Sequence, residues 1–235
     1  MKAILSWSSG KDSAYTLFTI LREAQFEVVE LLTTVTDVYQ RVSMHGVREE
    51  LLDLQAESID LPLSKIRIPS HCPNDVYEAK MEAYLKERKK RGIEHVIFGD
   101  LFLEDLRQYR ETKLAQIGMK GVFPLWKYPT DLLSKKIIDD GFEVLLSCVD
   151  PKKLPKEFAG RKYDASLLKD LPPEVDPCGE YGEFHSFAYG GPIFKREIPI
   201  QVGERVERDG FAFADILTHS PSSPSLRSRL RNNGS

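Results

Sequence analysis

Three serines, one glycine, one lysine and one aspartate stand together at residues 8–13, in the order S-S-G-K-D-S. A short apolar run at residues 3–5 precedes them, and an apolar pattern with helical spacing follows. This order predicts a strand, a turn of small residues and a helix. The first N–H groups of a helix lack partners within it, and the helix dipole favours negative charge there. With the Lys11 cation and the serine hydroxyls added, the stretch predicts a phosphate-binding turn.

Two common phosphate-binding motifs do not fit this turn. A P-loop has a glycine, four further residues, and then glycine, lysine and serine or threonine. Here Asp12 follows Gly10 and Lys11, and Leu5 stands where the first glycine would be. A dinucleotide-binding loop needs three glycines, whereas Gly10 is the only glycine in the first 45 residues. The turn is therefore of another kind.

A second dense stretch, at residues 176–185, places two carboxylates close together. Glu180 and Glu183 flank Gly182, and Gly179 precedes them, just before a predicted strand. Glycines let the backbone turn so that both carboxylates face one opening. Carboxylates can bind Mg²⁺, abstract a proton or hold a cationic substrate. From these residues alone, a solvated acidic turn explains the stretch equally well.

The elements that must position these two stretches alternate between strand and helix. Strands are predicted at residues 3–5, 28–35, 63–68, 93–98, 121–126 and 142–149. Helices are predicted between them, at residues 14–21, 46–59, 75–91, 103–117 and 132–140. Repeated strand–helix units predict an α/β fold with a doubly wound, mainly parallel sheet. Ligands of such sheets bind beyond the carboxyl ends of the strands, which groups residues 6–13, 33–37 and 99–105 around one crevice.

The composition of the sequence changes near residue 150, where prolines interrupt the regular patterns of strands and helices. Residues 184–189 alternate in polarity, and residues 193–202 are predicted to pair back on them as a hairpin. We therefore expect a smaller C-terminal α+β subdomain for the substrate. The predicted division is a phosphate-binding domain at residues 1–130, this subdomain at 131–218, and a disordered tail rich in Ser, Arg and Asn at 219–235.

The composition argues against several classes of function. The 33 basic and 36 acidic residues give a net charge of −3, so no basic excess favours nucleic acid. No apolar run approaches the roughly 18 residues of a membrane span, and no signal-peptide pattern opens the chain. Cys72, Cys148 and Cys178 form no C-x-x-C pair, which disfavours a zinc ribbon or a dithiol motif. We expect a cytoplasmic protein without a membrane partner, and a homodimer stays open.

The S-S-G-K-D-S stretch resembles the PP-loop, S-G-G-K-D-S, of the ATP pyrophosphatase superfamily, with Ser9 in place of the first glycine. Those enzymes split ATP between its α- and β-phosphates and transfer AMP to a substrate oxygen. Gly99-Asp100 and the G-E-Y-G-E-F stretch at residues 179–184 occur in the same order in the diphthine–ammonia ligase-like group of this superfamily. The resemblance covers roughly residues 1–200.

This resemblance implies an adenine nucleotide α-hydrolase-like fold and an AMP-forming ligase that uses ATP and Mg²⁺. The archetypal reaction of the group joins ammonia to the carboxylate of diphthine on elongation factor 2, giving diphthamide. Cys178, the G-G-P-I-F stretch at residues 190–194 and the loop at residues 100–105 suggest a divergent branch. The acceptor carboxylate of this chain is therefore left open.

The resemblance also implies roles for individual residues. The implied catalytic residues are Lys11, Asp12, Asp100, Glu180 and Glu183. The implied ATP-binding residues are Ser8, Ser9, Gly10, Lys11, Asp12, Ser13, Thr34, His45 and Gly99. Asp12 is also the expected Mg²⁺ ligand. Trp126 and Tyr128 could face the quaternary ammonium of diphthine, with ordinary packing as the alternative.

Two other functions fit the same turn. A tRNA-modifying PP-loop enzyme, either a thiolase or a lysidine-type ligase, shares the loop, although sulfur transfer usually enlists a cysteine pair. A nucleotide-binding sensor without turnover would give Asp12 and the two late glutamates no chemical role. Release of AMP and pyrophosphate that depends on ammonium would indicate the ligase. Turnover that depends on tRNA would indicate the modifying enzyme, and binding without turnover the sensor.

Overall fold

The computed structural model describes residues 1–36, 41–42 and 46–219. A parallel sheet is built from β1 Lys2–Ser6, β2 Glu27–Thr36, β4 Leu63–Ile68, β5 His95–Ile97 and β6 Lys120–Val122. Its order is β4-β2-β1-β5-β6, and the short β3 Arg41–Val42 joins the end of β2 in the antiparallel sense. The predicted α/β class, with a doubly wound and mainly parallel sheet, is confirmed.

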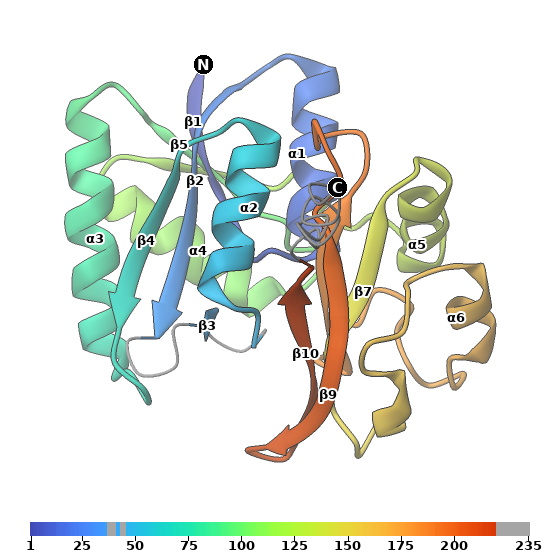
Figure 1. Cartoon of the computed structure of the whole chain (residues 1–235). Helices are drawn as coiled ribbons and strands as arrows, with labels where there is room; N and C mark the ends of the chain where they lie inside the picture. The colour runs from blue at the N-terminus through green and yellow to red at the C-terminus, as the bar shows by residue number, and fades with distance from the viewer. Residues whose placement is uncertain (37–40, 43–45, 220–235) are drawn as a thin grey trace, which may run out of the picture.

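Helices cover both faces of this sheet (Figure 1). The first pair, α1 Lys11–Glu23 and α2 Glu49–Ile59, lies on one face, and the second pair, α3 Asn74–Lys90 and α4 Glu104–Gln116, lies on the other. Successive side chains of a strand point to opposite faces. Accordingly, Ala3 and Leu5 of β1 join the larger hydrophobic cluster with α1 and α2, while Ile4 joins the smaller cluster with α3 and α4.

A second, antiparallel sheet packs beyond α1 and α2 (Figure 1). Its strands are β7 Glu143–Val149, β8 Phe184–Gly190, β9 Ile200–Arg208 and β10 Phe211–Thr218, in the order β8-β7-β10-β9. It is accompanied by α5 Thr130–Asp139, the 3₁₀ turn η1 Lys156–Phe158 and α6 Ala165–Asp170. This arrangement confirms the expected smaller α+β region after the parallel sheet.

The sixth predicted strand, residues 142–149, does not continue the parallel sheet. It is β7, which pairs with β8 and β10 in the antiparallel sense. Residues 144–149 of β7 are all buried, because the strand packs in the same core as Leu17 of α1 and Leu133 of α5. A strand that is covered on both faces has a continuous apolar sequence in a parallel sheet and in an antiparallel sheet alike. The sequence pattern therefore did not indicate which strands β7 pairs with.

The predicted hairpin between residues 184–189 and 193–202 is wrong. The first segment is β8, which pairs with β7, whereas the second runs into β9, which pairs with β10. Pro192 and Pro199 have no N–H to donate to a ladder. Between these prolines, the Lys195 N–H donates to the Ser58 carbonyl of α2 at 2.8 Å, and only the Ile198 N–H returns to β8, at the Tyr189 carbonyl.

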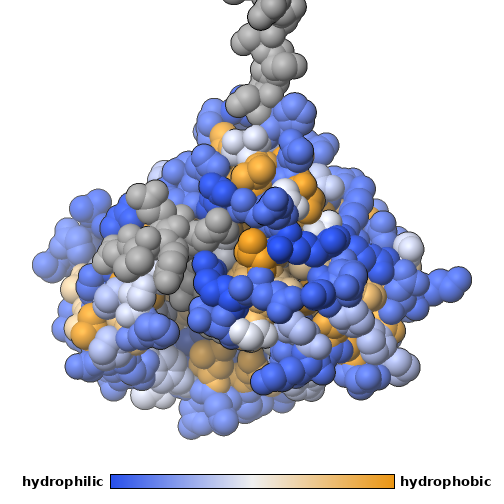
Figure 2. Space-filling model, turned by 60° about the horizontal axis from the view of Figure 1, so that its bottom comes forward, coloured by the Kyte–Doolittle hydropathy of each residue, from blue (hydrophilic) through white to orange (hydrophobic). Residues whose placement is uncertain are grey.

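The chain changes direction across the sheet between β1 and β5, because β2 and β4 lie on one side of β1 while β5 and β6 lie on the other. Ligands of open α/β sheets bind at such a switch point, beyond the carboxyl ends of the strands. That end of the molecule, turned to the viewer in Figure 2, is mainly hydrophilic with hydrophobic residues exposed near its middle. The loops after β1 and β5 meet there. Asp37 and residues 220–235, which are all but the first residue of the predicted tail, lie outside the described residues.

Candidate active site

The turn between β1 and α1 is held in an unusual backbone conformation. Ser9 has a φ of 71°, in the left-handed region that favours glycine. Gly10 then forms the N-cap of α1. A Cβ atom on Gly10 would lie 3.1 Å from both the carbonyl oxygen and the Oγ of Ser186. At the second position β8 approaches so closely that glycine fits best, while the first position holds a serine.

Two hydroxyls of this turn lie at the mouth of α1. The Oγ atoms of Ser8 and Ser13 are 3.1 Å apart. The Gly10 N–H donates to Ser8 Oγ at 3.3 Å, and the Ser13 hydroxyl donates to the Gly10 carbonyl at 3.0 Å. Together with the N-terminal end of α1, these groups make up the turn that the sequence predicts to bind phosphate.

Lys11 is almost completely buried, with 1% of its surface exposed. Its Nζ lies 2.9 Å from both carboxylate oxygens of Asp12 and also donates to the Cys178 carbonyl. The rings of Tyr163 and Phe184 lie under the ammonium, with centroids 5.7 and 5.6 Å away. Burial is the largest influence and lowers the pKa of Lys11, but the Asp12 carboxylate, with Cys178 and Glu180 added, outweighs it, so that the pKa is raised. The ammonium is thus held in place by its neighbours.

The loop at residues 176–183 covers Lys11. Two carboxylates of this loop accept hydrogen bonds from its backbone N–H groups and so hold its conformation. Asp176 accepts hydrogen bonds from the Cys178 N–H at 2.8 Å, the Glu180 N–H at 3.3 Å and the Thr130 hydroxyl at 2.6 Å. Glu183 is buried and accepts from the Asp176 N–H at 3.3 Å and the Tyr181 N–H at 2.9 Å. Glu183 is therefore turned into its own loop rather than toward the cleft.

Glu180, by contrast, faces the cleft. Its Oε1 accepts a hydrogen bond from the Leu101 N–H at 3.2 Å, which ties the loop to the segment after β5. Partial burial, reinforced by the negative charge of Asp12, raises the pKa of Glu180 to about 7. A carboxyl group with this pKa is poised to accept or donate a proton near neutral pH.

Gly99 and Asp100 follow β5 and complete the cleft. A Cβ atom on Gly99 would lie 3.1 Å from the Asp12 backbone, so glycine lets this loop approach α1 closely. Asp100 forms an ion pair with Arg110 of α4, with the Arg110 Nε 3.3 Å from a carboxylate oxygen. Burial, with the charge of Asp12 added, raises the pKa of Asp100 although Arg110 opposes the shift.

These groups share one cleft of about 630 Å³ at the carboxyl end of the parallel sheet. It brings together seven of the residues predicted from the sequence: Ser8, Lys11, Asp12, Ser13, Gly99, Asp100 and Glu180. Ser9 and Gly10 lie directly behind its wall. Thr34 lies within β2, paired with Ile66 of β4, and does not line the cleft. His45 lies outside the described residues.

The two aromatic residues predicted to face a substrate cation do not reach this cleft. Trp126 packs on Phe123, and the Arg107 guanidinium covers its ring at 4.6 Å. Tyr128 lines a different depression, beside Tyr15 of α1. An exposed aromatic residue that does line the cleft is Tyr181, which is 59% exposed and lies 5.5 Å from the Phe102 ring, centroid to centroid.

Sequence reasoning also missed four polar residues of the cleft or its support: Arg110, His185, Ser186 and Gln55. His185 and Ser186 directly follow the G-E-Y-G-E-F stretch, and this adjacency could have indicated them. Burial and the Lys11 charge lower the pKa of His185 to about 4, so its imidazole is neutral at physiological pH. Ser186 accepts a hydrogen bond from the Lys11 N–H at 3.1 Å.

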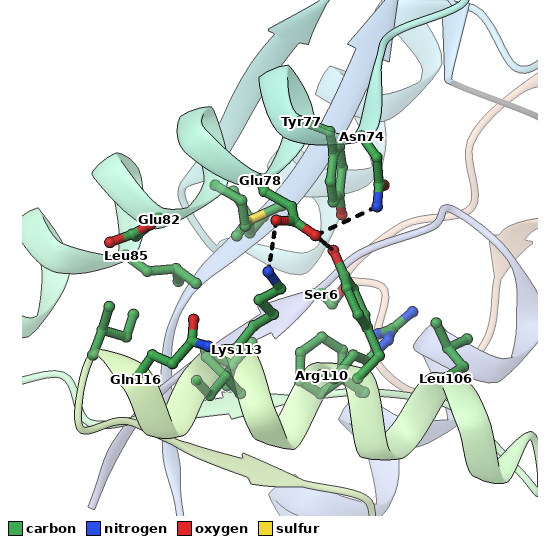
Figure 3. Close-up of a pocket in the computed structure, with 17 residues that line it drawn as sticks. Ser6, Asn74, Tyr77, Glu78, Glu82, Leu85, Leu106, Arg110, Lys113 and Gln116 are labelled. Carbon is green, nitrogen blue, oxygen red and sulfur yellow. Dashed lines mark hydrogen bonds and ion pairs between the residues drawn. The ribbon is translucent and has the colours of Figure 1, made fainter.

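A second hollow adjoins the cleft, between α3 and α4 (Figure 3). This α3/α4 groove has a volume of about 240 Å³ and shares Ser6, Leu106 and Arg110 with the cleft. In its centre Glu78 accepts hydrogen bonds from Lys113 at 2.6 Å and from the Tyr109 hydroxyl at 2.9 Å. Its floor is apolar, with Val96 and Phe98 contributed by the β5 segment.

Comparison with known proteins agrees with this architecture. Residues 1–121 match the diphthamide synthase N-terminal domain, and residues 129–219 match the diphthamide synthase C-terminal domain. The chain belongs to the diphthamide synthase family. This confirms the predicted resemblance to the diphthine–ammonia ligase-like group, and with it the predicted class of enzyme, an ATP-dependent ligase.

Several curated proteins are similar to this family member along most of its length. The diphthine–ammonia ligase of Rattus norvegicus is 25% identical over 236 residues, which cover 89% of this chain and 86% of that protein. The human protein of the same name is 24% identical with the same coverage. Among solved structures, a predicted tRNA methyltransferase subunit from Methanocaldococcus jannaschii aligns with 84% of this chain and 100% of its own, at 15% identity and a TM-score of 0.45.

The described part of this diphthamide synthase family member contains neither a membrane-spanning helix nor a cluster of metal-binding side chains. In residues 1–36, 41–42 and 46–219, no helix combines the length and apolarity that crossing a membrane requires. Over the same residues, His, Cys, Asp and Glu side chains nowhere gather in a group of three or more that could hold a metal ion.

Proposed function

We propose that this chain is an AMP-forming ligase that activates the carboxylate of a diphthine-type acceptor with ATP and joins it to ammonia. One observation carries the proposal: a single cleft combines a buried lysine at a phosphate-binding turn with a carboxyl group whose pKa is about 7. The first feature serves phosphate chemistry, and the second serves proton transfer. The reaction needs both in the same place.

In this proposal the turn at residues 8–13 holds the phosphates of ATP. The Ser8 and Ser13 hydroxyls donate to phosphate oxygens, and the N-terminal end of α1 adds its dipole. Lys11 neutralises charge that builds up on the leaving pyrophosphate. Because its ammonium is held by Asp12 and the Cys178 carbonyl, it needs little reorganisation when the α–β bond breaks.

Mg²⁺ fits the cleft only as a partner of the nucleotide. Asp12 is the expected ligand, with its carboxylate 27% exposed, and Asp100 faces it closely enough for the two charges to interact. One or two carboxylates plus substrate phosphates is the usual arrangement for this ion. When bound, Mg²⁺ supplies charge neutralisation to the triphosphate. Asp12 would hold it, while Arg110 keeps Asp100 oriented.

The substrate steps follow from these positions. An acceptor carboxylate oxygen attacks the α-phosphorus, pyrophosphate leaves, and an acyl-adenylate forms. An ammonium ion binds near Glu180 and loses one proton to the Glu180 carboxylate. Ammonia then attacks the acyl carbon, AMP leaves, and the second proton lost by the nitrogen passes to solvent. Glu183 takes a positioning role, because its two bonds to the Asp176 and Tyr181 N–H groups fix the loop that carries Glu180. Burial raises the pKa of Cys178, and likewise that of Cys148, to about 12, so neither of these two cysteines offers a thiolate for sulfur transfer.

The division of labour follows the two sheets. We propose that residues 1–130 bind ATP and that residues 131–218 receive the acceptor. Tyr181, exposed at the cleft mouth beside Phe102, belongs to the second part and would contact the acceptor. The compartment and the oligomeric state stay predictions.

Product analysis with a matched pair of lysine variants tests the proposal. The wild-type protein should release AMP and pyrophosphate from ATP only with ammonium and elongation factor 2 that carries diphthine. Lys11→Met should lower kcat by roughly 10²–10³-fold, as expected for loss of a preorganised electrostatic group. Lys113→Met, at an exposed ion pair in the α3/α4 groove, should keep near-normal activity. Full activity in Lys11→Met, ADP as the product, or turnover only with tRNA would contradict the proposal.

A further inference from the structure

Gln55 is a polar residue in an apolar setting. It lies on α2 with no exposed surface, flanked on the helix by the buried Leu51, Leu52 and Ala56. Its side-chain oxygen accepts a hydrogen bond from the Trp7 indole N–H at 2.8 Å. Its Nε2 donates to the Ser9 carbonyl at 3.0 Å and to the Ala188 carbonyl at 2.6 Å. One amide thus joins the β1–α1 turn, α2 and β8.

The Ser9 carbonyl is the centre of this arrangement. It accepts from Gln55 on one side and from the Ala188 N–H at 3.0 Å on the other. A carbonyl oxygen has two acceptor positions, and both are filled here by groups from distant parts of the chain. Since Ser9 has a left-handed φ of 71°, the turn needs outside support to keep this conformation. The two bonds supply it.

An apolar side chain of similar length would serve the core without the need to satisfy three polar partners. Burying an amide is tolerated only where its hydrogen bonds are made, and removing it leaves the Ser9 and Ala188 carbonyls with fewer donors. The polar groups that Gln55 contacts all belong to the turn or to the strand behind it. Its place in the core is therefore explained by the turn rather than by packing.

We propose that Gln55 is a positioning residue for the ATP-binding turn. It fixes the conformation of Ser9 and thereby the placement of Ser8 and Gly10 on either side. The inference rests on the proposed ATP site, because it takes the turn as the place where the phosphates bind. It predicts that loss of the amide weakens ATP binding beyond any effect on overall folding.

The test uses Trp7 as a local reporter. The chain has two tryptophans, and Trp126 packs on Phe123 outside the cleft. In a Trp126→Phe background, Trp7 fluorescence can therefore follow titration with an ATP analogue that carries a methylene bridge between the α- and β-phosphates. Gln55→Met should raise the Kd of this analogue, and the KM for ATP, on the order of tenfold. The change in kcat should be smaller.

Leu52→Ala is the matched control, because Leu52 is equally buried on the same helix and makes no side-chain hydrogen bond. It should lower the unfolding temperature at least as much as Gln55→Met while leaving the Kd unchanged. Should Gln55→Met fail to fold, Gln55→Asn draws the amide back by one methylene and tests the same bonds more mildly. Unchanged binding in the Gln55 variants, or equal weakening in Leu52→Ala, overturns the inference.

The outcome is separable from that of the proposed function. If the parent protein binds the analogue but forms no amide, the ligase proposal fails while the role of Gln55 is still decided by the Kd values. If the parent does not bind the analogue at all, both proposals fail together. If Gln55→Met lowers kcat tenfold and leaves the KM and Kd unchanged, Gln55 does not position the binding turn.

Discussion

The two faces of the parallel sheet are built differently. On the α1/α2 face, a second sheet covers the helices, and a single hydrophobic cluster runs from β1 through α1 to β7 and α5. On the α3/α4 face, a smaller cluster lies under two helices that leave an open groove of about 240 Å³ between them. The first face is sealed by protein on its outer side, whereas the second borders solvent.

The polar groups of the two faces differ accordingly. On the sealed face, Lys11, Gln55 and Ser186 are buried. The Lys11 N–H donates a hydrogen bond to Ser186, and the Gln55 amide donates one to the Ser9 carbonyl. In the open groove, the ion pair of Glu78 and Lys113 keeps 27% and 41% of its side-chain surface exposed. Buried polar groups need fixed partners and so fix geometry, while exposed pairs contribute little rigidity. The phosphate-binding turn lies where the protein can hold it most firmly.

Leucine truncations on the two faces should give the largest contrast. Leu17 of α1 is fully buried between the sheets, and Leu17→Ala should destabilise the protein by about 4 kcal/mol, since a closed cavity would remain. Leu114 of α4 borders the groove, and Leu114→Ala should cost only about 2 kcal/mol, because it widens an existing opening. Urea unfolding with unchanged m-values would measure both.

Equal losses in the two variants would contradict the contrast between the faces. Both variants exchange leucine for alanine in a helix. The free energy of transferring the lost atoms from water to the core, and the change in helix propensity, are therefore the same in both. Circular dichroism of the folded baselines serves as the control that neither helix is lost.

Most of the parallel sheet could be predicted, because its information is local. Strands such as residues 3–5 and 28–35 are largely apolar runs, and the helices carry their own periodicity, as in Leu17 and Leu51. The second sheet could not, since its pairings join segments far apart in the chain. Nothing near residue 144 indicates that Val144 pairs with Ala188, and an apolar run fits either sheet.

The residues of the candidate site were likewise predicted only in part. Lys11 and Glu180 were predicted to share a cleft, because the carboxyl-end rule and the family resemblance act together. Glu183 was predicted beside them, but left-handed glycines at positions 179 and 182 turn the loop so that this carboxylate meets backbone N–H groups instead. Gln55 was missed because its partners lie 46 and 133 residues away. The one available signal was an amide on the buried face of a helix.

The pH dependence of ammonia use tests the contrast between the two faces through Glu180, which lies in the cleft. Glu180 must be ionised to take a proton from ammonium, and its pKa is about 7. The kcat/KM for ammonium should therefore fall about tenfold per pH unit below this value, since kcat/KM reports groups of the free enzyme. Glu180→Gln should lower activity at pH 8 by about 10²-fold and remove this acidic limb.

Stability measurements provide the control for that assignment. The pKa of Glu180 is raised on folding, so its contribution to stability is fully present below its ordinary value of 4.5 and is lost as the pH rises through about 7. The difference in unfolding free energy between the wild type and Glu180→Gln should change within this window and be constant outside it. An acidic limb that persists in Glu180→Gln would assign the proton transfer to another group.

The smallest expected effect concerns backbone strain on the sealed face. Ser9 has a left-handed φ of 71°, is fully buried, and its hydroxyl has no hydrogen-bond partner among the described residues. Ser9→Gly relieves about 1–2 kcal/mol of backbone strain and removes the buried hydroxyl. The greater flexibility of glycine in the unfolded chain costs about 0.5–1 kcal/mol of this gain. The variant should gain about 1 kcal/mol in unfolding free energy.

The reverse exchange on the open face completes this comparison. Gly92, which follows α3, has a φ of 80°, and a Cβ atom there would meet nothing within 4 Å. Gly92→Ser should therefore cost about 1 kcal/mol from backbone strain alone. If Ser9→Gly gained nothing while Gly92→Ser carried its full cost, the packing of the buried Ser9 side chain would offset the strain at the turn, because the bonds to the carbonyl of residue 9 form with either residue. The sealed face would then hold a non-glycine residue in the left-handed conformation without loss of stability, whereas the open face uses glycine there.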